Sequence, residues 1–321
     1  SDVSARTNER VENHPSGSMR GTMDVMTARF GRVLTAMVTP FGPDGSLDLD
    51  GAQSLARHLT TEGGNDGLVI AGTTGESPTL TQDEQVDLVR AVVDAVDVPV
   101  VAGAGSNDTH VAVRNTELVT EAGATGVLHV AGYYNRPSQA GLIEHFRACA
   151  EATDLPTLLY DIPGRTGRKV ATETMVDLFV TVDNIVGVKD AAGSPAETAR
   201  LLTMAPEGTE VYSGDDGLTL PLLAIGAVGT IGVATHWVGR ETRAMFDAFE
   251  QGRVEEAMAI NRRLIPSYRF ETSDAAPNPV PTKALLRLQG LPAGPCRLPM
   301  GPEPDGLELE AKSVLAALAR G

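Results

Sequence analysis

The stretch "IVGVKDAAGSPAE" (residues 185–197) joins a short apolar run to the start of a helix. Residues 185–188 are mostly β-branched, which predicts a buried strand. Ser194 followed by proline and, at the third position, Glu197 has the pattern of a capping box at a helix start. The stretch is therefore one strand–loop–helix unit, and Lys189 lies at the carboxyl end of its strand.

The same unit recurs along the chain, because short β-branched runs alternate with amphipathic segments from residue 32 onward. A second capping-box pattern, Thr81 with Glu84, precedes one of these segments. Most of the runs are continuously apolar, as parallel strands covered on both faces are. Such alternation predicts an α/β fold, a (β/α)8 TIM barrel with a C-terminal helical extension. A doubly wound open sheet is the alternative, although no G-x-G-x-x-G motif follows the first run. The eight predicted strands are 32–40, 67–72, 98–104, 126–132, 156–162, 185–190, 210–215 and 229–234.

Three segments follow from this pattern. Residues 1–30 are polar and without periodicity, which predicts a disordered N-terminal extension, with Met19, Met23 or Met26 as a native start. That segment has no apolar stretch of the kind a signal peptide needs. Residues 31–240 form the predicted barrel, and the helical periodicity of residues 241–321 predicts a C-terminal helical extension.

Composition narrows the class of protein. The 321 residues carry a formal net charge of −16, which argues against nucleic acid and anionic membranes as partners. No run approaches the roughly 18 apolar residues of a membrane span, so the cytoplasm is the expected location. Cys149 and Cys296 are predicted to be reduced thiols.

Polar side chains follow several predicted strands at the end where a barrel carries its chemistry. The histidines and cysteines lack metal-ligand spacing, and no P-loop or nucleophile elbow is present, so we expect no metal and no separate cofactor. The two aspartates of "SGDD" (213–216) are interpreted as turn and cap residues. The other groups are Thr73, Thr74, Tyr133, Tyr134, Tyr160, Arg165 and Lys189.

Together these groups suit an amine nucleophile that forms a Schiff base with a carbonyl substrate. Lys189 must then be partly neutral, which burial or a nearby cation can produce. Tyr160 is the natural acid and base, the "GTTG" loop supplies hydrogen-bond donors for a carboxylate, and Arg165 can bind a second carboxylate. Each group also has a purely structural reading, as a turn, an aromatic contact or a solvated cation.

Six motifs make the chain recognisable. "GTTGES", "YYNRPSQAGLIEHF", "LYDIPGRTG", "GVKDAAG" and "SGDD" follow one another in this order, and "NPVPTKALLRLQG" (278–290) comes late in the chain. In sequence and spacing the chain resembles the dihydrodipicolinate synthase family, part of the wider N-acetylneuraminate lyase group of pyruvate-dependent class I aldolases. The resemblance covers about residues 31–300.

The resemblance implies roles for the polar groups. Lys189 is expected to condense with pyruvate, so that the covalent imine takes the place of a cofactor. Tyr160 is expected to pass protons beside it, and Thr73 to link Tyr160 to Tyr134. Tyr133 is expected to reach across a tight-dimer interface, within a homotetramer built from two such dimers.

Substrate binding is implied in the same way. Thr74 is expected to bind the pyruvate carboxylate, with the backbone of Gly214 and Ile231 lining the pocket. Arg165 is expected to bind the carboxylate of L-aspartate 4-semialdehyde, and it favours this reaction over those of sialic-acid lyases and sugar-acid aldolases. The implied product is 4-hydroxy-tetrahydrodipicolinate, which feeds diaminopimelate and lysine biosynthesis.

Two alternatives stay open at this point: a sibling aldolase that uses the same lysine, and a non-catalytic barrel. The chain also departs from the family pattern. Ala131-Gly132 precedes the two tyrosines, where Thr-Pro is usual. The family's lysine-binding cleft is matched at Ser77, Asn107 and Tyr133, whereas Gln82, Gln85 and Val111 replace its His and Glu positions. We therefore expect weak or absent feedback inhibition by lysine.

Overall fold

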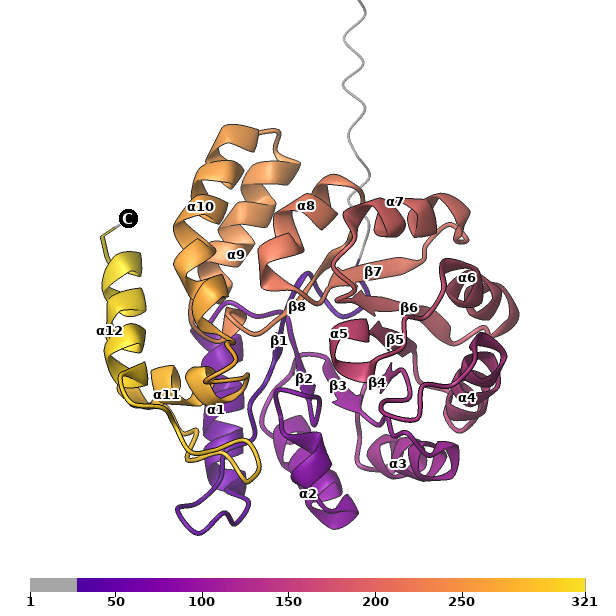
Figure 1. The fold of residues 1–321 in the computed structure, drawn as a ribbon, viewed down its shortest axis with the longest axis horizontal. Coiled ribbons are helices and arrows are strands. Elements are labelled where there is room, and N and C mark those ends of the chain that lie inside the picture. The colour runs from indigo at the N-terminus through magenta and orange to yellow at the C-terminus, as the bar shows by residue number, and fades with distance from the viewer. Residues whose placement is uncertain (1–27, 321) are drawn as a thin grey trace, which may run out of the picture.

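The computed structural model describes residues 28–320, and within that range eight parallel strands close into a barrel (Figure 1). Each strand pairs with the next in sequence order, and β8 pairs with β1 through Leu34 and Ile231. This closure confirms the predicted barrel and excludes the open sheet. The strands are β1 Val33–Ala36, β2 Gly67–Ile70, β3 Val100–Gly103, β4 Gly126–Val130, β5 Thr157–Asp161, β6 Ile185–Asp190, β7 Glu210–Ser213 and β8 Gly229–Gly232.

The barrel interior is filled by side chains. Because side chains alternate along a strand, every second residue points inward, and these residues make one buried cluster. Tyr160 belongs to this cluster at the carboxyl end of β5. The cluster also contains Leu34, Ala36, Val69, Val101, Leu128, Leu158, Tyr212, Val228 and Ile231.

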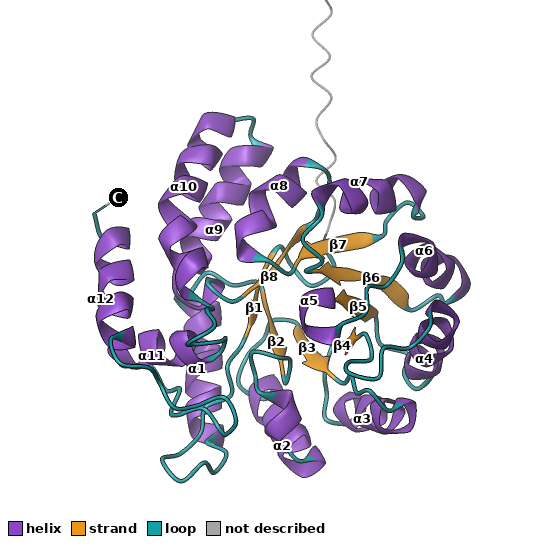
Figure 2. Cartoon of the chain, in the orientation of Figure 1, coloured by secondary structure: helices purple, strands orange, loops and turns teal. Residues whose placement is uncertain are grey.

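A ring of helices covers the outer face of the strands (Figure 2). Both predicted helix starts are present: the Thr81 hydroxyl accepts from the Glu84 amide, with the reciprocal bond in place, and the Ser194 hydroxyl accepts from the Glu197 amide. These caps fix where the loops over the barrel mouth end. The helices that follow the strands in turn are α1 Leu49–Thr61, α2 Gln82–Val93, α3 Thr109–Glu121, α4 Gln139–Glu151, α6 Thr172–Thr181, α7 Pro195–Met204, α8 Thr219–Ala224 and α9 Thr235–Glu250. Short segments over the mouth are η1 Ser77–Thr79, α5 Pro163–Thr166 and η2 Asp216–Leu218.

The C-terminal part adds α10 Val254–Phe270, α11 Val280–Leu288 and α12 Leu307–Leu318. The predicted boundary at residue 240 falls inside α9, which packs on β1 as the eighth helix of the barrel. The boundary differs because only two residues separate β8 from α9, so no sequence break marks the change. The packing of α10 on α9 then joins the extension to the barrel.

Most of the predicted disordered extension (1–30) lies outside the described residues. Phe30, however, is buried at the amino-terminal end of the barrel, and its amide donates to the Tyr212 hydroxyl at 3.4 Å. A Cβ on Gly126 would come within 2.6 Å of the Phe30 ring, so glycine is needed beneath it. Residues of the predicted extension thus already belong to the described fold before residue 31.

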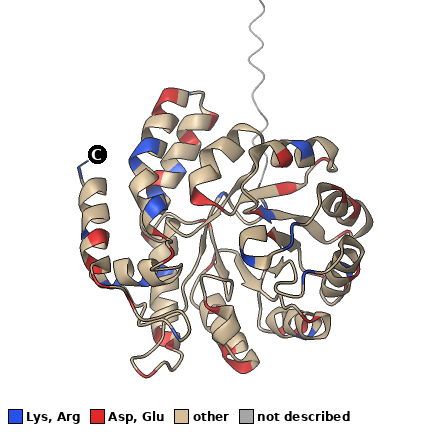
Figure 3. Cartoon of the chain, viewed as in Figure 1, with Lys and Arg blue, Asp and Glu red and all other residues tan. Residues whose placement is uncertain are grey.

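Charged side chains lie mainly on the surrounding helices and loops, and the strands carry few of them (Figure 3). Cys149 and Cys296 are free thiols, as predicted. None of the helices in residues 28–320 combines the length and apolar character that crossing a membrane requires.

Candidate active site

Lys189 and Tyr160 lie side by side on neighbouring strands. They are in register between β5 and β6, so their side chains leave the sheet on the same face. The ammonium nitrogen of Lys189 lies 4.4 Å from the centre of the Tyr160 ring, and the lysine is only 5% exposed. A Cβ on Gly214 would come within 2.9 Å of the Lys189 side chain, so glycine at this position gives the lysine its room.

Burial makes Lys189 a usable nucleophile. Loss of water around the ammonium group lowers the pKa of Lys189 to about 8, with Asp216 and Glu271 opposing the shift and Arg165 adding to it. At pH 7 about a tenth of the side chain is then the free amine, against roughly one part in three thousand at the ordinary pKa. Burial of Lys189 in the structure thus provides the neutral amine that the Schiff-base hypothesis requires.

Imine formation on Lys189 is expected to rise about tenfold per pH unit below pH 8 and to level off above it, because only the neutral amine attacks a carbonyl. The measurement is the rate of borohydride trapping at low pyruvate concentration between pH 6 and pH 9. A rate that is flat across this range would mean that the amine is not the group being titrated.

Tyr160 is held as a neutral phenol beside the lysine. Burial raises the pKa of Tyr160 to about 12, while the charge of Arg165 and a hydrogen bond with Thr73 act in the opposite direction. A phenol that stays protonated can donate a proton to an oxygen on the substrate, and Thr73 gives it a hydroxyl partner for return of that proton. Thr73 and Tyr160 are therefore in hydrogen-bond contact, and their part in a proton relay stays a prediction.

The loop that carries Thr73 and Thr74 is fixed from the C-terminal part of the chain. The Asn278 side-chain amide donates to the Thr74 hydroxyl at 2.9 Å, and both residues are buried. Glu76, which follows them in the left-handed backbone region at φ 57°, forms a fully buried ion pair with Lys283 at 2.6 Å. The second Glu76 carboxylate oxygen accepts from the amide of Arg297 at 2.8 Å.

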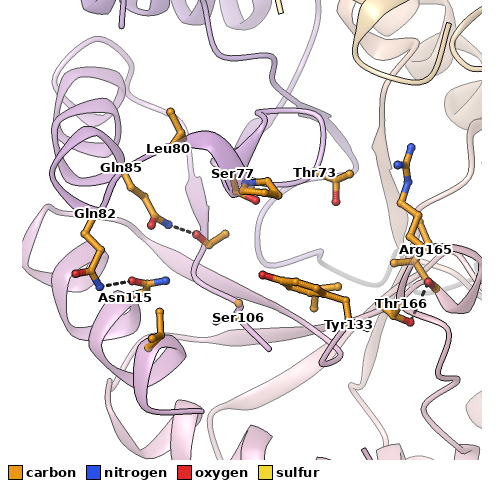
Figure 4. A pocket seen from close by; sticks show the side chains of 16 residues that line it. Thr73, Ser77, Leu80, Gln82, Gln85, Ser106, Asn115, Tyr133, Arg165 and Thr166 are labelled. Atoms are coloured by element: carbon orange, nitrogen blue, oxygen red, sulfur yellow. Dashed lines mark hydrogen bonds between the residues drawn. The ribbon is translucent and has the colours of Figure 1, made fainter. Parts of the chain in front are cut away.

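Two cavities meet at Thr73, Ile162 and Arg165. The first, of about 310 Å³, contains Lys189 and Tyr160 together with Thr74, Gly214 and Glu271. The second, of about 360 Å³, is shown in Figure 4, where Tyr133 lies between the amide side chains of α2 and α3 at one end and Thr73 and Arg165 at the other. Arg165 is exposed on α5, at the junction of the two.

The structure gathers most of the predicted site but not all of it. Lys189, Tyr160, Thr73, Thr74, Arg165 and Gly214 line one cavity. The Ile231 side chain points into the barrel interior at 1% exposure, and Val233, in the loop directly after β8, lines the cavity. The part expected of the Ile231 backbone stays a prediction.

Tyr134 is also placed differently. The prediction that Thr73 links Tyr160 to Tyr134 is not seen within one chain, because Tyr134 is 90% exposed and lines neither cavity. Its backbone lies in the left-handed region, at φ 70°. Tyr133, expected to leave its own subunit, instead lines the second cavity beside Thr73.

Several cavity residues were missed or misread. Tyr268, Glu271 and Asn278 line the cavity from the C-terminal part, and only the resemblance of residues 278–290 to a family segment pointed there. Asp215 caps η2, as predicted, by accepting from the Gly217 amide at 2.9 Å. Asp216 lies in the η2 turn, as predicted, but its side chain is buried at 3% exposure and accepts from the Val233 and Ala234 amides, which the sequence did not indicate.

The residues of the predicted lysine cleft lie in the second cavity. Ser77, Gln82, Gln85, Val111 and Tyr133 line it, whereas Asn107 does not. The Gln82 amide donates to the Asn115 side chain at 2.9 Å, and the Gln85 amide to the Gly103 carbonyl. Both glutamines are thus already engaged, and weak inhibition by lysine stays a prediction.

A single protein-family model covers both the barrel and the C-terminal helices. The model of the Dihydrodipicolinate synthetase family matches residues 29–318. The chain belongs to this family. The resemblance stated from the sequence motifs is therefore confirmed, and the non-catalytic scaffold has no support from the match.

Members of the dihydrodipicolinate synthetase family are similar to the chain along nearly all of its length. The 4-hydroxy-tetrahydrodipicolinate synthase of Acidothermus cellulolyticus is 52% identical over 283 residues, which are 87% of this chain and 89% of the relative. That of Moorella thermoacetica is 48% identical over 293 residues, 90% and 97% of the two chains.

Solved structures of dihydrodipicolinate synthases are also similar to the chain. The dihydrodipicolinate synthase of Bacillus anthracis has a TM-score of 0.86 at 42% identity, covering 89% of this chain and 98% of that one. The enzyme of Cyanidioschyzon merolae, solved with lysine bound, has a TM-score of 0.87 at 43% identity, covering 90% and 98%. The barrel and its C-terminal helices are thus the common fold of this family.

Proposed function

We propose that the chain condenses pyruvate with L-aspartate 4-semialdehyde through an imine on Lys189, giving 4-hydroxy-tetrahydrodipicolinate. The chain is a lyase of diaminopimelate and lysine biosynthesis, and relatives about half identical to it carry the name of this enzyme. The observation that carries the imine is a buried lysine with a lowered pKa that contacts a buried tyrosine. We place the reaction in the cytoplasm.

Lys189 and Tyr160 have different roles in the proposed reaction. The neutral amine of Lys189 attacks the ketone carbon of pyruvate, and Tyr160 protonates the oxygen that leaves as water. The resulting positive nitrogen draws electrons from the adjacent bond, and the methyl carbon gives a proton back to the Tyr160 phenolate. The carbon then attacks the aldehyde, whose oxygen takes that proton from Tyr160. The amine of the second substrate then closes the ring and displaces Lys189, which is released unchanged. Thr74 is placed to hold the pyruvate carboxylate.

Borohydride reduction in the presence of pyruvate, followed by peptide mapping, tests this directly. Lys189 is one of four lysines in the chain, which keeps the map simple. A reduced pyruvyl adduct on Lys189 is the expected result. An adduct elsewhere, or none on folded protein, contradicts the proposed mechanism.

Arg165→Ala is expected to lower kcat/KM for L-aspartate 4-semialdehyde by about a hundredfold, since a charge-assisted bond to the substrate carboxylate contributes about 1.5–3 kcal/mol. Pyruvate trapping should persist, because Arg165 lies at the cavity junction rather than against the lysine. Steady-state kinetics with both substrates measure the effect. Arg147→Ala, on α4 and paired with Glu144, is the matched control.

The same variant separates this function from that of a sibling aldolase. If Arg165→Ala leaves turnover of aspartate semialdehyde unchanged, the arginine does not select the aldehyde. A sugar-acid or N-acetylneuraminate-type substrate then becomes the better reading. Loss confined to aspartate semialdehyde supports the synthase.

We also propose that Tyr134 completes the proton relay in a second copy of the chain, within a dimer that further assembles into a tetramer. An aromatic side chain 90% exposed on a left-handed turn beside the cavity loops is placed to enter a neighbouring subunit. Tyr134→Phe is expected to lower kcat about a hundredfold, as loss of a general acid–base group does, without changing stability.

Subunit mixing tests this arrangement. Tyr134→Phe and Lys189→Met chains are each expected to be nearly inactive, and their co-expression should restore activity, because one mixed site then has both groups. If mixing restores nothing, Tyr134 does not act across subunits.

A further inference from the structure

The carboxyl of Glu271, in the wall of the Lys189 cavity, contacts the buried carboxyl of Asp216 behind it. Asp216 follows β7 and Glu271 follows α10, so the fold brings together residues that are far apart in sequence. One Asp216 oxygen accepts from the amides of Val233 at 2.7 Å and Ala234 at 3.2 Å. The remaining partner of Asp216 is the carboxyl of Glu271, with which it forms a hydrogen bond.

Glu271 faces the cavity and has spare hydrogen-bonding capacity. It lines the cavity together with Lys189. Its Oε2 atom is buried and accepts no hydrogen bond from an ordinary donor group of the described residues, so the facing Asp216 carboxyl is its available partner. The proposed mechanism gives this carboxyl no role.

Two carboxyl groups in contact cannot both be ionised when they are buried, since each negative charge opposes the other. Burial raises the pKa of both, and the neighbouring Asp216 charge further raises that of Glu271. A hydrogen bond between two carboxyls also requires one of them to carry a proton. A hydrogen-bonded pair of this kind holds at least one proton, which leaves it at most one negative charge.

Other charged and titratable groups face this pair. Asp215 adjoins Asp216 in the same loop, Tyr268 precedes Glu271 by about one turn of α10, and Lys189 and Arg165 face it across the cavity. Asp215 and Tyr268 contribute no positive charge. The positive charges that face the pair are therefore those of Lys189, which is buried, and Arg165, which is exposed.

We propose that Asp216 and Glu271 hold one shared proton and that their single negative charge stabilises the positively charged imine on Lys189. This rests on the proposed imine mechanism. The burial that frees the lysine amine also disfavours the cationic imine, and a fixed negative charge offsets that cost. The two carboxyls are positioning residues, because they act through Lys189 and not on the substrate.

A shared proton has a distinctive signature in amide variants. Glu271→Gln leaves Asp216 ionised, and Asp216→Asn leaves Glu271 ionised, because each single change removes the shared proton and not the charge. Only the double variant loses the negative charge. The pyruvate concentration for half-maximal borohydride trapping is expected to stay within about twofold in either single variant and to rise about tenfold in the double variant.

Asp274→Asn, an exposed change in the loop after Glu271, is the control for removal of a nearby charge and should leave trapping unchanged. Equal losses in the single variants, adding up in the double, would show two independent charges and overturn the shared proton. A folded double variant that traps pyruvate like the unmodified protein would overturn the electrostatic role.

Infrared difference spectra provide a readout that needs no double variant. The carbonyl band of a protonated carboxyl should be present at pH 7 and disappear in both single variants. A band that persists in Asp216→Asn would show a proton belonging to Glu271 alone. If the unmodified protein forms no adduct on Lys189, the proposed function fails, while the infrared result still decides whether the proton is shared.

Discussion

Lys189→Met is expected to lower kcat by at least about four orders of magnitude, because the side chain that forms the covalent intermediate is removed. No pyruvyl adduct should form at any pH. Methionine is close to lysine in length and suits a position only 5% exposed, so the barrel should stay folded. Turnover and trapping are measured on the same preparation, with circular dichroism to check the fold.

Lys312→Met is the matched control. Lys312 is exposed on α12, pairs with the equally exposed Glu308, and does not line the Lys189 cavity. It should keep pyruvate trapping on Lys189. Residual activity above one percent in Lys189→Met would show that another group forms the covalent bond, and would remove the basis of the proposed mechanism.

Lys283→Met is expected to destabilise the protein by about 3–5 kcal/mol, because Glu76 is left as an unpaired charge in a fully buried site. The melting temperature should fall by on the order of 10 °C. The ammonium group of Lys283 also donates to the Pro295 carbonyl at 2.9 Å and lies 4.3 Å from the centre of the Phe41 ring. Thermal and urea unfolding measure the loss.

The exposed pair of Lys312 and Glu308 provides the control, since Lys312→Met should cause no measurable change. Adding Glu76→Gln to Lys283→Met should recover part of the stability, because the unpaired charge is then gone. If Lys283→Met is no less stable than Lys312→Met, the buried pair does not hold the Thr73–Thr74 loop.

The barrel could be predicted because its signals are local. The β-branched runs and the caps at Thr81 and Ser194 each need only a few neighbouring residues, and all of them appear as expected. The predicted strands were longer than the observed ones at several ends. After β1, for example, Met37 and Val38 are buried and apolar but no longer belong to the strand.

The rest of the site depends on contacts between distant segments. In sequence, the residues around Asp216 indicate only a turn. The contact of Asp216 with Glu271 arises from the fold. The amide of Asn278 on Thr74 likewise joins residues separated by most of the barrel. The role of Tyr134 stays a prediction for another reason, since the surroundings of an exposed side chain depend on the assembly and not on one chain.

The attachment of the Thr73–Thr74 loop to Asn278, Lys283 and Arg297 has a consequence for synthesis on the ribosome. Translation completes all eight strands by Gly232, well before these three residues emerge. A nascent chain can therefore close its barrel while Glu76 still lacks its cation and Thr74 its amide partner. Catalytic competence is expected to appear late in translation, after the barrel has formed, and a messenger truncated ahead of codon 283 should yield chains that contain Lys189 but no organised pocket around it.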